Sequence, residues 1–245
     1  MRSTALLFVL LAGCAAAPQR QVELPGTEWL LTEIRGAPLV AGSRVTLRFE
    51  PGSAGGYNGC NWYGGDYVLT GSNIKWGDIS QTLRGCLQPG IQDQERNYHR
   101  SLHEAVVVDA TKDRLTLKSA SGQPLLVFAR RVPADVDPSQ LIGRWRLRTI
   151  DGAPPAAQNV VVTFTAGTIT GFAGCRDFTS TYTANGDQIR LTSTEMASTE
   201  CPQNDAGIIA EGDFTTHLSE SEHYRINGRQ LEITTAGGHK LIFER

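Results

Sequence analysis

Short segments in which apolar and polar residues alternate recur along the chain, and this pattern is typical of β-strands. Residues 45–49 read Val-Thr-Leu-Arg-Phe, and residues 160–164 are rich in β-branched residues in the same way. Residues 189–191 and 231–233 carry shorter versions of the alternation. Glycine-rich turns follow the first two segments, so the pattern predicts many short strands joined by tight turns.

One longer segment breaks this pattern and predicts a helix. Residues 93–106 contain neither glycine nor proline, and apolar side chains recur near one face at helical spacing. The residues on that face are Ile91, Tyr98, Leu102 and Ala105, and a later segment carries Ile208, Phe214 and Leu218 in the same way. Because a lone antiparallel sheet leaves one apolar face in water, we expect each helix to cover an open side or end of a curved sheet.

The whole pattern occurs twice, at an offset of 115 to 116 residues. The aligned pairs include Trp29 with Trp145, Phe49 with Phe164, Cys60 with Cys175, Cys86 with Cys201, Leu102 with Leu218 and Phe128 with Phe243. Such a period is too long for a solenoid repeat and close to the size of a small domain. We therefore expect two tandem domains, residues 24–131 and 139–245, joined by a short, stiff linker at residues 132–138 that contains two prolines. The expected fold class is β-rich α+β, with each domain a curved antiparallel β-sheet or barrel-like unit and one packed helix.

The first copy resembles the META domain family, which includes the heat-shock protein HslJ. The resemblance is carried by Trp29-x-Leu31, by the Gly-Cys-Asn-x-Tyr core at residues 59–63, by Thr-Leu-Arg-Gly-Cys at residues 82–86 and by the closing segment 115–128. It implies a compact β-rich fold with a helix, a location in the cell envelope and an association with stress tolerance. It brings no established catalytic residues.

The second copy is similar to the same family but departs from it at two places. Trp145-x-Leu147 and residues 170–178 match, whereas Arg176 stands where the family usually has asparagine. Ser198 stands where the family's second cysteine would fall, and Cys201 follows three residues later. The two resemblances together cover about residues 24–245.

The amino end predicts a lipoprotein signal. Met1 and Arg2 precede a short apolar stretch at residues 5–12, which is too short to span a bilayer. Leu11-Ala12-Gly13-Cys14 resembles the bacterial lipobox, so residues 1–13 are expected to be removed and Cys14 to be lipidated, with residues 14–23 as a tether. The alternative is an ordinary secretory signal that is cleaved at residues 15–17. Ala15 after the cysteine favours the outer membrane, facing the periplasm, in a Gram-negative source.

The net charge of the chain excludes two further classes of binding partner. The formal net charge is -2, from 23 basic and 25 acidic residues, so the chain lacks the excess of Lys and Arg with which proteins bind nucleic acid or anionic membranes. The expected partners are therefore the membrane, through the lipid anchor, and a protein of the cell envelope.

Five cysteines divide into one lipid acceptor and four others. Cys60 and Cys86 are 26 residues apart, and so are Cys175 and Cys201. In an oxidising envelope this spacing predicts one disulfide in each domain. A zinc site of four cysteines is the alternative, but the chain has no Cys-x-x-Cys pair and the cysteines fall in separate domains.

The sequence predicts neither a metal site nor a cofactor. Glu95, His99 and His103 follow one another at helical spacing and could bind a divalent metal, but the second copy lacks the set, and the exposed face of an amphipathic helix is the commoner explanation. His217, His223 and His239 have no partner in the sequence that suggests a relay. Because no nucleophile, base and orienting group can be assembled, we expect a protein that is not an enzyme.

The most variable part of the repeat suggests a recognition surface. Arg176, Asp177 and Thr179 of the second copy replace Asn61, Trp62 and Gly64 of the first. Polar replacements are tolerated at outward-facing positions, so Asn61 and Trp62 are expected to be exposed and to contact a partner. The alternative is that Trp62 shields the neighbouring disulfide.

The expected function is that of a stress-related binding or structural module. The second hypothesis is a carrier that holds a small hydrophobic ligand inside a β-barrel-like cavity.

Overall fold

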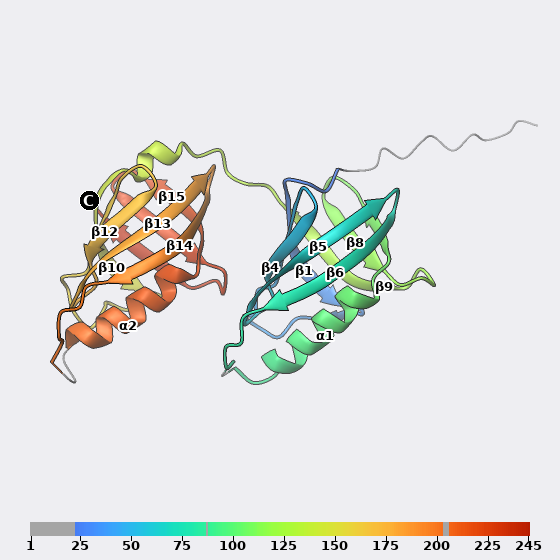
Figure 1. Ribbon diagram of the computed structural model, residues 1–245, viewed down its shortest axis with the longest axis horizontal. Helices are drawn as coiled ribbons and strands as arrows, with labels where there is room; N and C mark the ends of the chain where they lie inside the picture. The colour runs from blue at the N-terminus through green and yellow to red at the C-terminus, as the bar shows by residue number, and fades with distance from the viewer. Residues whose placement is uncertain (1–22, 87, 203–205) are drawn as a thin grey trace, which may run out of the picture.

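The computed structural model describes residues 23–86, 88–202 and 206–245 of the chain. They form two β-rich domains that lie side by side, each with one helix packed against its sheet (Figure 1). The expected fold class, two tandem domains of β-rich α+β type, is confirmed. The predicted signal segment and the lipidation site Cys14 lie outside the described residues. No helix in the described part of the chain is long and apolar enough to cross a bilayer.

The first domain is one antiparallel sheet of nine strands in the order β2-β1-β3-β4-β5-β6-β7-β8-β9. Since β1 also pairs with β9, the sheet closes on itself and β2 remains as an appended strand. The strands are β1 (Thr27–Ile34), β2 (Ala37–Pro38), β3 (Thr46–Glu50), β4 (Ser53–Tyr57), β5 (Trp62–Thr70), β6 (Asn73–Gln81), β7 (Val107–Ala110), β8 (Arg114–Lys118) and β9 (Pro124–Arg131).

The second domain is a closed barrel whose eight strands follow one another in chain order. Closure removes the exposed edges that would otherwise pair with another chain. The strands are β10 (Gly143–Ile150), β11 (Val161–Phe164), β12 (Thr168–Phe172), β13 (Asp177–Asn185), β14 (Gln188–Met196), β15 (Ser221–Asn227), β16 (Gln230–Thr235) and β17 (Lys240–Glu244). The 3₁₀ helix η1 (Pro138–Leu141) precedes them.

Equivalent side chains fill the inside of both domains. Trp29 and Trp145 are fully buried at the start of each sheet, and Phe49 and Phe164 are buried beside them. The indole Nε1 of Trp29 donates to Thr27 Oγ1 at 2.7 Å, and that of Trp145 donates to the Leu141 carbonyl oxygen at 2.7 Å. Both of these buried indole donors therefore have a hydrogen-bond acceptor.

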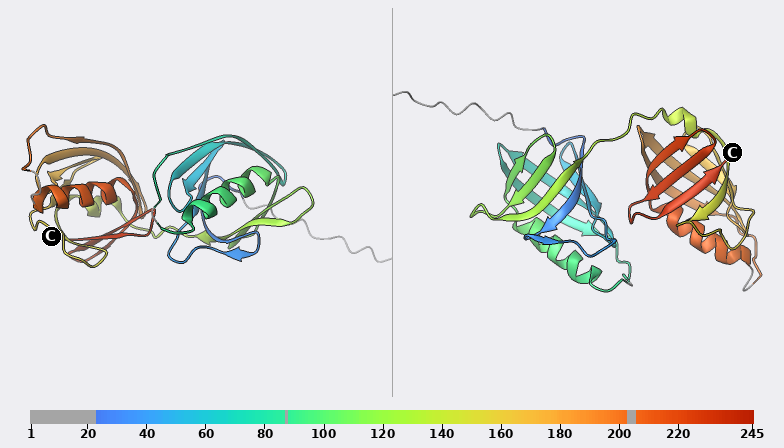
Figure 2. Two further views of the ribbon diagram at one scale, coloured as in Figure 1. Left: turned by 90° about the horizontal axis from the view of Figure 1, so that it is seen from below. Right: turned by 180° about the vertical axis from the view of Figure 1, so that it is seen from behind.

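In each domain the helix is inserted in the chain between the two strands that pair least. β6 and β7 share a single residue pair, Asn73 with Val107, and β14 and β15 share only Gln188 with His223. The helices α1 (Ile91–Glu104) and α2 (Ala206–Ser219) enter the chain at these two places. Seen from below, each helix lies across one open end of its barrel (Figure 2, left), which is the position that the apolar helix face predicts.

The predicted disulfides are present in the structure. Cys60 is bonded to Cys86 and Cys175 to Cys201, with Cα atoms 5.8 and 6.1 Å apart. In each domain the bond joins the turn before a long strand to the segment that leads into the helix. A closed loop of this size restricts the unfolded chain strongly, so each disulfide stabilises its own domain.

Candidate functional site

Buried charged groups join the two domains. Glu28 on β1 is 3% exposed and accepts hydrogen bonds from Gln188 Nε2 at 3.0 Å and from Arg131 Nη1 at 3.3 Å. Its other carboxylate oxygen lies 3.0 Å from His223 Nε2 of β15. Arg131 Nη2 also reaches Asp187 Oδ2 of the second domain at 2.5 Å. The first domain thus supplies a buried carboxylate that is bonded by side chains of both domains.

Glu222 is the matching carboxylate of the second domain. It is 2% exposed and pairs with Arg44 of the first domain. Burial alone would raise the pKa of Glu222, but hydrogen bonding to His223 and the charge of Arg44 outweigh it and lower the pKa to about 2. Burial lowers the pKa of His223, but its bonds to Glu222 and Glu28 outweigh this and raise that pKa.

We call the seven residues that make these contacts the ionic interface. They are Glu28, Arg44, Arg131, Asp187, Gln188, Glu222 and His223. A buried charge is unfavourable unless it is paired, so sliding or rotation of one domain against the other would leave these groups without partners. The interface therefore favours one relative orientation of the domains.

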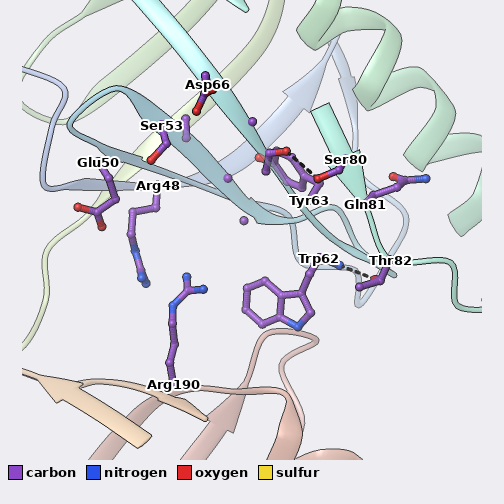
Figure 3. Close-up of a pocket in the computed structure, with 15 residues that line it drawn as sticks. Arg48, Glu50, Ser53, Trp62, Tyr63, Asp66, Ser80, Gln81, Thr82 and Arg190 are labelled. Atoms are coloured by element: carbon purple, nitrogen blue, oxygen red, sulfur yellow. Dashed lines mark hydrogen bonds between the residues drawn. The ribbon is translucent and has the colours of Figure 1, made fainter. Parts of the chain in front are cut away.

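A cleft of about 750 Å³ opens beside the ionic interface (Figure 3). The outer face of β3 to β6 forms most of it, and Arg190 of β14 closes it from the second domain. Its lining residues are Arg48, Glu50, Ser53, Ala54, Gly55, Gly56, Trp62, Tyr63, Gly64, Gly65, Asp66, Ser80, Gln81, Thr82 and Arg190. The cleft has the size of a small-molecule site.

Two glycines make its floor. Arg48 pairs with Gly55, Gly55 with Gly64, and Gly64 with Ser80, so the four residues form one row across β3, β4, β5 and β6. Neighbouring side chains in such a row lie on the same face of the sheet. Gly55 cannot carry a side chain, since an added Cβ would lie 2.5 Å from the Tyr63 carbonyl oxygen. Along this row, the cleft is therefore bordered by the Arg48 guanidinium, then by exposed backbone, and then by the Ser80 hydroxyl.

The second domain fills the same row with side chains. Thr163 pairs with Thr170, Thr170 with Thr179, and Thr179 with Glu195. Alignment of the two repeats shows that Thr179 stands where the first domain has Gly64. That Gly64 leaves a hollow becomes apparent only when the strands are paired. The hollow thus belongs to the first domain alone.

Two arginines point into the cleft from opposite domains (Figure 3). Arg48 Nε is buried without a hydrogen-bond partner, and Arg48 Nη2 lies 3.7 Å from Glu28 Oε2. Arg190 forms no ion pair with any described residue. Desolvation in the cleft and the like charge of Arg48 lower the pKa of Arg190. Two guanidiniums that disfavour each other in this way create a site where an anion is stabilised.

Trp62 lies at the end of the cleft. The Arg190 guanidinium carbon is 5.3 Å from the Trp62 ring centroid, a cation–π contact between the domains. Trp62 also meets Tyr57 edge to face, with ring centroids 5.7 Å apart. The side chain is partly exposed, so its predicted part in recognition stays a prediction, now with a cleft beside it.

The expectation that Asn61 is exposed is wrong. It is 3% exposed, and its Nδ2 donates to Glu95 Oε1 at 3.0 Å. Its Oδ1 accepts from Thr82 Oγ1 at 2.9 Å and from the Arg84 backbone N at 2.7 Å. Asn61 therefore holds the segment before Cys86 against the helix, and a polar side chain with every group bonded is stable inside.

The helical set Glu95, His99 and His103 does not form a common site. Asn58 Nδ2 contacts Glu95 Oε1 at 3.0 Å and His99 Nε2 at 2.9 Å, while His103 is exposed on the next turn. The residues that do meet in the cleft, Arg48 and Arg190, carried no signal in the sequence except an outward position on an alternating strand.

Comparison with known proteins gives the following matches. The model of the META domain matches residues 22–132 and 139–245. Among solved structures, the chain is similar to an NMR structure of a protein from Burkholderia xenovorans, with 19% identity, 47% of this chain and 92% of that chain covered, and a TM-score of 0.36. It is also similar to a crystal structure of a DUF4847 family protein from Bacteroides vulgatus, with 15% identity, 42% and 92% covered, and a TM-score of 0.34. No curated protein matches the chain significantly.

Proposed function

The chain belongs to the META domain family, and from this premise we propose that its two domains form a non-enzymatic binding module of the bacterial cell envelope. The module binds a small polar anion in the cleft between the domains. It is held at the outer membrane, facing the periplasm, by acyl chains on Cys14. We expect the module to act in stress tolerance, because the family resemblance implies that association.

The observation that carries the proposal is the pair of guanidiniums in one cleft. Arginine binds carboxylate and phosphate groups through two parallel hydrogen bonds. Arg190 forms no salt bridge in the described part of the chain and feels the carboxylates of Glu222, Glu28 and Glu50 only at longer range, so its guanidinium donors are available to a ligand. Glu50 and Asp66 line the same cleft, so a ligand that fits also carries hydroxyl or amino groups. The ligand class is therefore a small molecule with one carboxylate or phosphate group and several hydrogen-bond donors.

The side chains around the cleft support binding without catalysis. In the described ranges, no hydroxyl or thiol group forms a hydrogen bond with a histidine ring, which is the contact that activates a nucleophile in hydrolases. The cleft itself is lined by Ser53, Ser80 and Thr82 but by no histidine. Binding is the activity that these groups fit.

The rival hypothesis of a hydrophobic carrier has less support. Buried side chains from the barrel strands and the helix pack into one cluster inside each domain. The largest of them include Trp29, Phe49, Phe128, Trp145, Phe164 and Phe243. Because the protein's own side chains fill the described interior in this way, a hydrophobic ligand has little space there.

Titration with simple anions tests the binding proposal. Glycerol 3-phosphate and gluconate, each with one anionic group and several hydroxyls, serve as probes, and tryptophan fluorescence reports on Trp62, which contacts Arg190 directly. We expect saturable quenching or enhancement that disappears in Trp62→Phe, and a loss of affinity of at least tenfold in Arg190→Gln. Absence of a response to both probes, or binding by Arg190→Gln equal to the wild type, would contradict the proposal.

The anchorage has its own test. Intact-mass analysis of protein from the envelope should show acyl chains on Cys14, and Cys14→Ser should give an unprocessed or misplaced protein without them. Normal acylation of that variant would refute the anchor and leave the cleft unaffected.

A further inference from the structure

A second polar cluster lies on the outer surface of the second domain, away from the cleft. His217 is in the last turn of α2, His239 lies in the turn between β16 and β17, and Asp151 follows β10. The two imidazole rings meet edge to face with centroids 4.8 Å apart. Three elements that are distant in the sequence thus bring two imidazoles and a carboxylate together.

The ligand atoms of this cluster are close enough for one metal ion. One nitrogen of each histidine and one oxygen of Asp151 lie within 4.8 Å of one another. Ligand atoms around a tetrahedral zinc ion are ~3.3 Å apart, given metal–ligand distances of about 2.0 Å. His239 and Asp151 are each about half exposed, so a small movement of this hydrogen-bonded pair brings the two imidazoles to the distance that one ion requires.

Hydrogen bonds on Nδ1 orient both rings. His217 Nδ1 lies 2.8 Å from the Asp213 carbonyl oxygen, and His239 Nδ1 lies 2.6 Å from Asp151 Oδ2. With the proton on Nδ1, each neutral ring donates this bond and keeps the lone pair of Nε2 for a metal. Metal-binding histidines usually hold their second nitrogen in this way, on a carboxylate or a backbone carbonyl.

We propose that His217 and His239 bind a divalent transition metal ion, with zinc as the type case, and that Asp151 orients His239 and adds a negative charge beside the ion. Imidazole ligands suit zinc, copper and nickel better than calcium or magnesium. Water completes the coordination shell, because the cluster lies at the surface. The site is independent of the interdomain cleft and of the anion that the cleft binds.

The corresponding corner of the first domain has a different chemistry. In the repeat, Ser101 stands at the position of His217 and Arg35 at that of Asp151. Arg35 Nε donates to Ser101 Oγ at 3.0 Å, and Arg35 Nη2 pairs with Glu104 Oε2 at 2.5 Å. A guanidinium at this place repels a cation, so we expect one metal ion per chain.

Calorimetric titration of the untagged, oxidised protein with zinc chloride tests the site. We expect one equivalent to bind, at least tenfold weaker binding in His217→Ala and His239→Ala, and about 10–100-fold weaker binding in Asp151→Asn, the usual loss when an orienting partner is removed. His103→Ala is the matched control, because His103 is an exposed histidine on the helix of the first domain. It should bind zinc like the wild type.

Two further measurements keep the outcome clear. His239 is about half exposed, so His239→Ala should melt at the wild-type temperature and its loss of zinc cannot come from unfolding. Cobalt in place of zinc should give the visible absorption of a four-coordinate site, which His239→Ala abolishes. The proposal fails if the wild type binds no stoichiometric zinc, or if His103→Ala weakens binding as much as His239→Ala.

Discussion

Both domains bury a helix carboxylate beside the first cysteine of the disulfide, but they satisfy it with different groups. In the first domain, Glu95 accepts hydrogen bonds from the side-chain amides of Asn58 and Asn61. In the second, Glu211 accepts from the backbone N of Arg176 at 2.9 Å and pairs with its guanidinium. The replacement of asparagine by Arg176 therefore preserves the contact and changes only the donor.

The outer faces of the two domains differ in a way that has no such compensation. Gly55 and Gly64 leave a hollow on the first domain, and Thr170 and Thr179 fill it on the second. The comparison teaches that a residue can be replaced without loss where the old and the new side chain both bond the same buried carboxylate. A change from glycine to threonine on the outer face of the sheet, by contrast, alters what can bind there. The following experiments challenge this distinction.

Removal of the disulfides should have the largest effect and should affect both domains alike. The two loops have the same sequence separation of 26 residues, so chain entropy predicts a loss of about 3.5 kcal/mol from the unfolding free energy of the affected domain. Calorimetry of Cys60→Ala/Cys86→Ala and of Cys175→Ala/Cys201→Ala should each lower one of two melting transitions. Losses that differ between the domains by more than about 2 kcal/mol would show that the disulfides do not play equivalent parts.

Loss of the Arg176 cation should destabilise the second domain, because Glu211 is then left buried without its charged partner. A fully buried pair loses about 3–5 kcal/mol when one partner is removed, but the Arg176 side chain is 34% exposed and Glu211 is 5% exposed, so the effect is smaller. Urea unfolding of Arg176→Met should show this loss, and Arg176→Met/Glu211→Gln should recover most of it. A double variant no more stable than the single one would show that Glu211 does not need a cation.

The ionic interface should give a smaller, pH-dependent effect of about 1 kcal/mol on docking of the domains. The raised pKa of His223 stabilises the docked state below the ordinary histidine value of 6.5, and this is lost as the pH rises through the docked value. The lowered pKa values of Glu28 and Glu222 stabilise the docked state above pH 4.5. This stabilisation is lost as the pH falls through the pKa values that the two carboxylates have in the docked state. Docking should therefore be strongest between about pH 4.5 and 6.5.

Small-angle X-ray scattering across that range measures the docking directly. The wild type should be most compact inside the window and should expand above it as His223 loses its proton. His223→Gln keeps an amide donor for Glu28 but cannot titrate, so its scattering should not change on the alkaline side. An identical alkaline response in this variant would remove His223 from the explanation.

The repeat made the fold predictable, whereas the site depended on contacts that a sequence does not display. Trp29, Phe49 and Leu102 recur at matching positions of the second copy, so the two cores and both disulfides could be predicted. His223 and Glu28 are 195 residues apart and meet only because the domains dock. Asn61 was expected at the surface because its counterpart is charged, but hydrogen bonds satisfy it inside.

The histidines of the second domain teach the same lesson. His217 and His239 are 22 residues apart with no recognisable spacing, and α2 and the β16–β17 turn place them side by side. Arg48 and Arg190 likewise come from different domains. A site formed between two elements or two domains can be predicted only when the strand register and the packing of those elements are known.

Gly64→Thr tests the central claim most directly, because it places the residue of the second domain in the cleft of the first. A Cβ at this position would lie 3.7 Å from the Ala54 carbonyl oxygen and 4.0 Å from the Gly55 Cα, both ordinary contacts, so the melting temperature should change by no more than about 2 °C. Titration with glycerol 3-phosphate or gluconate, followed by Trp62 fluorescence, should show binding to the wild type and at least tenfold weaker binding to Gly64→Thr. Equal binding by the two proteins would contradict the claim that the glycine floor between Arg48 and Ser80 is the ligand site.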